Sequence, residues 1–235
     1  MLAVLVVVFA VAAPATPQAH ARFVGAVEQA KAHLLVCGEL YAGGQAREAA
    51  LHASHPVQEI GGRIYAPVKR VDATLGERVQ AALKRPRRDV DAKTAPAELQ
   101  RTLDATVALL DEAVARVVPS ALAGTAGFKA AVLREMLTGL EKEYDEAYKE
   151  GAITQLVEYH DAYGFFARGR SLYRDLAPAL RQVSASSAAI AEQRMAVLAR
   201  AFPGLTPPAS PMSLATLREH LAALSRALDA VPAAS

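Results

Sequence analysis

The chain has little of what holds small disulfide-rich proteins and β-sheets together. Its 235 residues include one cysteine and no tryptophan, and aromatic residues make up 6% of the sequence. A lone cysteine cannot form an internal disulfide, which excludes a disulfide-stapled scaffold. Because sheets favour aromatic and β-branched residues, this composition also argues against a fold built on sheets.

An excess of charge is lacking as well. Twenty-six basic residues face 24 acidic ones, for a net charge of +2. Proteins that bind nucleic acid or an anionic membrane usually concentrate positive charge on one face. We therefore expect neither partner.

The motifs of several common enzyme and cofactor classes are absent. The sequence contains no C-x-x-C-H haem attachment site, no H-E-x-x-H zinc helix and no Glu-x-x-His pair typical of di-iron bundles. It has no phosphate-binding glycine loop and no G-x-S-x-G nucleophile elbow. The sequence favours a protein that is not an enzyme.

What is present begins with an apolar N-terminus. Residues 2–13 form an unbroken apolar run, and Ala19-His20-Ala21 follows as an A-x-A cleavage motif. This layout is typical of a secretory signal peptide, although no Lys or Arg precedes the run. The run is shorter than the roughly 20 residues that a membrane span needs. We predict a signal peptide over residues 1–21, a periplasmic or secreted location, and no membrane span in the mature chain.

The remaining sequence has the pattern of helices separated by glycine and proline. Apolar residues account for 52% of the chain, with many alanines, and alanine is the strongest helix former. Short connections between helices predict an all-α, up-and-down antiparallel bundle of about six or seven helices. Residues 22–235 should form one domain, with an alternative sub-boundary in a charged loop at 84–95. The leucine stripe of the last helix could close the bundle or face a protein partner.

The first candidate site lies in the first helical hairpin. A turn at Gly43-Gly44 places residues whose numbers sum to about 88 opposite one another. His33 then lies level with His55, and Cys37 lies near His52. The predicted metal-ligating set is His33, Cys37, His52, His55 and Glu59. Imidazole and thiolate are ligands of transition metals such as zinc, copper, iron and nickel.

A second candidate site lies near a turn at Gly151. His160 falls on the apolar stripe of its helix, and the hairpin brings Glu158 opposite Tyr144. The predicted set is Tyr144, Glu158, His160 and Asp161. A histidine beside carboxylates could act as a ligand or as an acid–base group. The alternative is a core histidine satisfied by one local hydrogen bond.

Three functions follow from these patterns, in order of preference. The first is a non-enzymatic exported protein that binds a transition metal ion or a haem-like ligand through the histidines of the first hairpin. The second is a protein-interaction or structural module without a cofactor. The third is a hydrolase with a histidine–carboxylate site.

Overall fold

Helices make up nearly all of the secondary structure in residues 15–233, the part of the chain that this computed structural model describes. They are α1 (Pro17–Ala42), α2 (Ala46–Gln58), α3 (Gly61–Val71), α4 (Ala73–Asp91), α5 (Pro96–Val117), α6 (Ser120–Ala123), α7 (Ala126–Ala147), α8 (Leu156–Val183), α9 (Ala185–Ala201) and α10 (Leu214–Leu228). The predicted all-α helical bundle is confirmed, with ten helices in these residues where about six or seven were expected.

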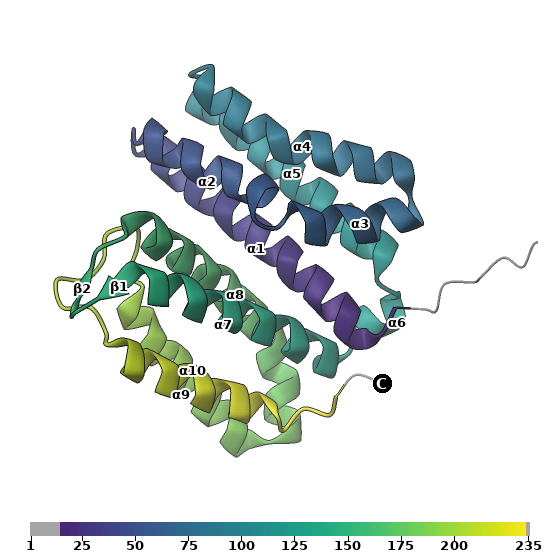
Figure 1. Cartoon of the computed structure of the whole chain (residues 1–235). Helices are drawn as coiled ribbons and strands as arrows, with labels where there is room; N and C mark the ends of the chain where they lie inside the picture. The colour runs from purple at the N-terminus through teal and green to yellow at the C-terminus, as the bar shows by residue number, and fades with distance from the viewer. Residues whose placement is uncertain (1–14, 234–235) are drawn as a thin grey trace, which may run out of the picture.

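The helices form two packed groups that share α1. Figure 1 shows α1 running diagonally through the molecule, with α2 to α5 on one side and α7 to α10 on the other. It packs against α2 and α5 in the first group and against α7 and α8 in the second. Most of α1 between residues 20 and 37 is buried, because both groups cover it. Its small side chains, such as Ala26 and Ala30, allow this close approach.

The segment predicted as a charged loop at 84–95 is helical through Asp91, so that expectation was wrong. Pro86 lies inside α4, where it cannot donate the backbone hydrogen bond to the carbonyl of Ala82. The hydroxyl of Thr106 on α5 lies 3.5 Å from that carbonyl, but it donates to the carbonyl of Thr102 at 2.8 Å. Leu83, Pro86 and Val90 are buried where α4 packs against α2 and α5, and this tertiary packing offsets the local cost of the proline.

A short hairpin joins α7 to α8, although no strand was expected. Strands β1 (Tyr148–Lys149) and β2 (Ala152–Ile153) pair antiparallel. Both turn residues have positive φ, 49° at Glu150 and 91° at Gly151. This is the backbone of a type I′ turn, which favours glycine and closes two-residue hairpins.

The apolar stripe of the last helix closes the bundle. Leu217, Leu221, Leu224 and Leu228 are all buried in the core of the second helix group. This excludes the stripe as the exposed docking face that the sequence left open as an alternative.

The N-terminal run at residues 2–13 lies outside the described residues. The predicted cleavage point after Ala21 lies within α1, whose first turn is capped by the Thr16 side chain. Export remains a prediction. No helix within residues 15–233 is long and apolar enough to cross a membrane.

Candidate metal centre

Three histidines surround one aspartate at the junction of the two helix groups. The Nδ1 atoms of His33 and His52 lie 2.6 Å and 2.8 Å from Oδ1 of Asp161. The Nδ1 atom of His55 lies 2.9 Å from Oδ2 of the same carboxylate. Potential ligand atoms of these four residues lie within 4.8 Å of one another. The structure therefore joins the first candidate site to a residue of the second.

The tight turn between α1 and α2 places the three histidines. Gly44 adopts a φ of 78°, which favours glycine, and the backbone N–H of Gln45 donates to the carbonyl of Leu40. The helices then run antiparallel. The ring centroids of His33 and His55 are 5.1 Å apart, and those of His52 and His55 are 5.3 Å apart. The hairpin thus gathers three imidazoles from two helices.

A close crossing of α1 and α8 brings in the aspartate. A Cβ added at Gly164 would lie 2.8 Å from the side chain of Val36 and 3.0 Å from the backbone oxygen of Ala32. Only glycine leaves room for this approach without displacing a neighbour. Asp161 lies one turn before Gly164 on α8, and His33 lies beside Ala32 on α1. The crossing therefore sets the contact between His33 and Asp161.

The cluster is almost entirely removed from solvent. The side chains of His33, His52 and Asp161 are at most 1% exposed, and that of His55 is 12% exposed. Burial by itself raises the pKa of a carboxyl, but the charge of His33 and the hydrogen bonds from all three histidines hold the pKa of Asp161 well below its usual 3.8. Asp161 is therefore an ionised carboxylate.

His55 feels two opposing influences. Burial favours its neutral form, but the hydrogen bond and charge of Asp161 outweigh burial and raise the pKa of His55 above the ordinary 6.5. Glu59 adds to this effect from 3.7 Å away. The outermost histidine of the cluster thus holds a proton more readily than an ordinary one.

A second group of oxygens adjoins the histidines. Glu143, Glu158 and Asp161 offer carboxylate oxygens within 4.8 Å of one another. Burial raises the pKa of Glu143 to about 7, although the neighbouring ammonium of Lys142 lowers it. Lys142 Nζ lies 3.1 Å from Glu143. The site is therefore acidic on one side and rich in imidazole on the other.

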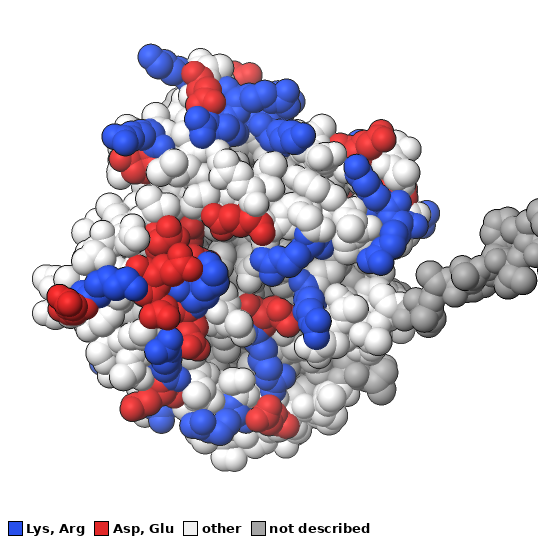
Figure 2. All heavy atoms as spheres, in the orientation of Figure 1, with Lys and Arg blue, Asp and Glu red and all other residues white. Residues whose placement is uncertain are grey.

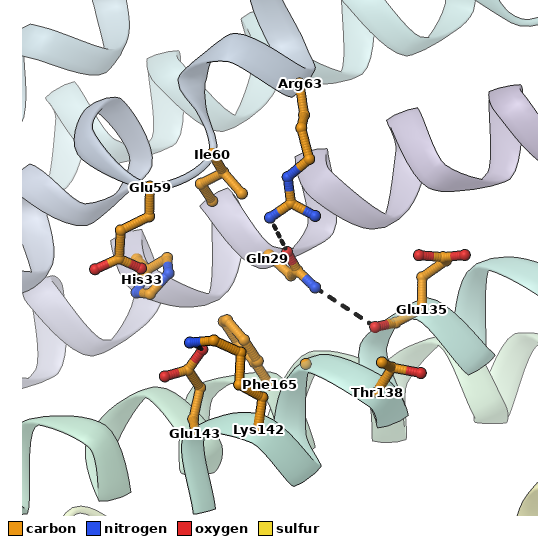
Figure 3. A pocket seen from close by; sticks show the side chains of 11 residues that line it. Gln29, His33, Glu59, Ile60, Arg63, Glu135, Thr138, Lys142, Glu143 and Phe165 are labelled. Carbon is orange, nitrogen blue, oxygen red and sulfur yellow. Dashed lines mark hydrogen bonds and ion pairs between the residues drawn. The ribbon is translucent and has the colours of Figure 1, made fainter. Parts of the chain in front are cut away.

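A cavity of about 300 Å³ reaches the cluster from the surface. Figure 3 shows His33, Glu59 and Glu143 along one end of it, with Lys142 beside Glu143. Figure 2 shows acidic side chains gathered over α7, with basic side chains among them. The charged lining of the cavity is mixed, with Glu59, Glu135 and Glu143 beside Arg63 and Lys142.

Five sequence-predicted residues lie outside the histidine–aspartate group, and one of them, Glu158, belongs to the adjoining carboxylate group. Cys37 is fully buried, and burial raises the pKa of its thiol to about 12, so the thiolate needed for metal binding is disfavoured. Glu59 is 48% exposed and lies 3.7 Å from Nδ1 of His55. Tyr144 is a core residue whose hydroxyl donates to the carbonyl of Met212. His160 forms a hydrogen bond through Nε2 to the backbone carbonyl of Leu205.

The sequence interpretation missed Glu143. In the hairpin that joins α7 to α8, Tyr148 pairs with Ile153. This register differs by one residue from the one that we expected. This shift places Glu143, rather than Tyr144, near Glu158. The type I′ turn at Glu150-Gly151 was the available signal, because its two-residue loop fixes the register.

The arrangement has the donors of a transition-metal site. Ligand atoms bound to one ion at about 2.1 Å lie about 3 Å apart. The observed nitrogen–oxygen distances of 2.6 to 2.9 Å are those of hydrogen bonds and fall only a few tenths of an ångström short. Three neutral imidazoles and one carboxylate suit zinc or iron(II). Glu158 and Glu143 add carboxyl groups next to this set.

Comparison with known proteins bears on the second half of the chain. No curated protein and no solved structure matches the chain. A family model does match, over a region that contains α7 to α10 and Asp161 but none of the three histidines. Together with the histidine–aspartate cluster, this match points to a metal-related role. Residues 119–235 are similar to the iron permease-associated 4-helix bundle domain, whose model they match.

Proposed function

We propose that this chain is an exported, non-enzymatic protein that binds one transition metal ion, iron(II) in its native setting, through His33, His52, His55 and Asp161. The observation that carries the proposal is the convergence of three buried imidazoles on one buried carboxylate. The similarity to an iron permease-associated domain favours iron over zinc. Four protein ligands leave two positions of an octahedral ion open, which suits an ion that must be taken up and released.

The charge of the site supports a divalent ion. Asp161 is ionised and neutral imidazoles add no charge, so a bound divalent cation leaves a net charge of about +1 on the ion and its ligands. Glu143 and Glu158 lie next to the ligand set, and the charge of a bound ion would favour their ionised forms, which compensate for it. The cavity beside His33 offers such an ion a path from solvent.

Direct metal titration tests the proposal. We expect untagged protein to bind one iron(II) ion per chain under anaerobic conditions, measured by calorimetry, and to unfold at a higher temperature when loaded. Changing His33, His52 and His55 to alanine together should abolish both effects. His220→Ala is the matched control, because His220 contacts Arg194 on another helix pair. Binding that survives the triple change would disprove the proposed ligand set.

The unused cysteine gives a sharper prediction. Cys37 lies near the cluster in sequence, but its buried thiol belongs to none of the groups of potential ligand atoms within residues 15–233. Cys37→Ala should leave the iron(II) dissociation constant within about twofold of the wild type. It should lower the free energy of unfolding by only about 1 kcal/mol, because a small apolar group is lost. A drop in affinity of tenfold or more would place the thiol among the ligands.

Metal affinity should depend on pH in a defined direction. Protons compete with the ion for imidazole nitrogens, and the pKa of His55 is raised above 6.5. Affinity should therefore be greatest above that pKa and fall as the pH is lowered through it. Titrations from about pH 8 to about pH 5.5 measure this fall. An affinity independent of pH over this interval would show that histidine is not a ligand.

A further inference from the structure

Two buried ring nitrogens beside the metal centre have no hydrogen-bond partner. They are Nε2 of His52 and Nδ1 of His160, on side chains that are 0% and 2% exposed. The two ring centroids are 5.5 Å apart. An unpaired polar atom in a protein interior costs free energy, so such a pair calls for an explanation.

The backbone fixes which nitrogen of His160 carries the proton. Its Nε2 atom lies 3.0 Å from the carbonyl oxygen of Leu205. A carbonyl can only accept, so Nε2 carries the hydrogen and donates it. In the neutral ring Nδ1 is then a bare acceptor. His160 is therefore prepared to receive a hydrogen bond at the nitrogen that has no partner.

Which ring nitrogen of His52 carries the proton depends on what its Nδ1 atom contacts. Without an ion, Nδ1 donates to Asp161 at 2.8 Å, and Nε2 is bare. Two bare acceptors then share one buried region and cannot bond to each other. When Nδ1 binds a metal ion, the single proton of the neutral ring must sit on Nε2 instead. His52 then becomes a donor on the side where His160 offers an acceptor.

We propose that His160 is a positioning residue for the metal centre, accepting a hydrogen bond from His52 when His52 binds the ion through Nδ1. This inference rests on the proposed function. The bond completes a chain from the ion through His52 and His160 to the carbonyl of Leu205. Metal-binding histidines commonly donate their second N–H to such an outer partner, which fixes the ring orientation and increases the basicity of the ligand.

A second metal ion between the two rings is the competing explanation. Within the described part of the chain, His160 belongs to no set of three or more potential ligand atoms that lie close together. Two nitrogens alone are too few to hold zinc or iron(II) in its usual coordination. A hydrogen bond needs only these two atoms, and the observed 5.5 Å between the ring centroids is a few tenths of an ångström longer than the distance of about 5 Å in a linear bond between imidazoles.

The chain of hydrogen bonds reaches the connection between α9 and α10. That segment is held elsewhere by the hydroxyl of Tyr159, which donates to the carbonyl of Gly204 at 3.1 Å. Leu205 therefore lies in a fixed backbone segment. The hydrogen bond from Nε2 of His160 to the carbonyl of Leu205 holds the His160 ring in place, and that ring then orients His52. The half of the chain that matches the iron permease-associated family thus supplies both Asp161 and the support for His52.

Two variants of His160 test the role. His160→Gln keeps an acceptor for His52 and a donor for Leu205, whereas His160→Leu keeps neither. We expect His160→Leu to weaken zinc and iron(II) binding by about 10- to 100-fold, as loss of an outer partner does elsewhere. His160→Gln should restore most of the affinity. Unchanged affinity in His160→Leu, with normal binding by the wild type, overturns the inference alone. No binding by the wild type overturns the proposed function as well.

A measurement on the unaltered protein avoids any folding defect of the variants. In zinc-loaded protein labelled with ¹⁵N, we expect nuclear magnetic resonance to detect scalar coupling across the bond from His52 Nε2 to His160 Nδ1. The coupling should be absent without metal. Its absence in the loaded protein, or two zinc ions per wild-type chain and one per His160→Leu chain, would contradict the positioning role.

Discussion

Replacing Asp161 with alanine should abolish high-affinity metal binding and destabilise the metal-free protein by about 3 to 5 kcal/mol. The carboxylate is the one group that all three histidines contact, at 2.6 to 2.9 Å. Its removal leaves three buried imidazoles without their common acceptor and takes the only anion from the ligand set. Urea unfolding of the metal-free protein and calorimetry with iron(II) measure the two effects.

Asp161→Asn separates charge from shape. The amide keeps the volume of the side chain, so most of the stability should remain, but the loss of charge should still reduce metal affinity by at least about 100-fold. Asp91→Asn is the matched control, because Asp91 is 54% exposed and pairs with Arg87 at the surface. Such a pair contributes less than about 1 kcal/mol. Wild-type affinity in Asp161→Asn would remove Asp161 from the ligand set.

The same variant should change acid unfolding. The pKa of Asp161 is depressed in the folded chain, so its ionised form stabilises the fold above the unfolded pKa, near 3.8. This stabilisation is lost as the pH falls through the lower, folded value. The free energy of unfolding of the wild type should therefore decline more steeply below about pH 4 than that of Asp161→Asn.

Adding one methyl group at Gly164 should weaken both the fold and the metal centre. In Gly164→Ala the new Cβ lies 2.8 Å from Val36 and 3.0 Å from the backbone of Ala32. Because a backbone atom is among the clashes, α1 and α8 must separate. Overpacking of this kind costs about 1 to 3 kcal/mol. The separation also pulls His33 away from Asp161, so iron(II) affinity should fall by about tenfold or more.

Gly62→Ala is the matched control for this change. Gly62 lies in α3, and a Cβ there meets no atom within 4 Å. Alanine favours helix over glycine by up to about 1 kcal/mol, so this variant should be as stable as the wild type or slightly more stable. A Gly164→Ala protein with wild-type stability and affinity would show that the crossing does not set the site.

The sequence predicts the contacts of the site that lie within one helical hairpin, but not those between two hairpins. The double glycine and helical spacing suffice to bring His33 level with His55, because both residues belong to one hairpin. Asp161 belongs to a different hairpin, and its approach to His33 depends on the crossing at Gly164. Nothing in the spacing of one helix specifies which face of another will meet it.

Two other differences have equally physical causes. The charged stretch around Pro86 has the composition of a loop, yet it is helical because α4 packs against α2 and α5 and buries Pro86 there. Glu143 rather than Tyr144 lies near Glu158 because the register at the β1–β2 turn differs by one residue from the expected one. The presence of helices and the all-α fold class follow from the composition and periodicity of the sequence. Register and helix crossings follow from packing.

The most direct test of the metal centre is an anomalous difference map, collected at the iron edge, from crystals grown with iron(II) under anaerobic conditions. We predict one peak per chain, within about 2.4 Å of the Nδ1 atoms of His33, His52 and His55 and of a carboxylate oxygen of Asp161. A map without a peak there, or with iron bound at another set of residues, would contradict the account.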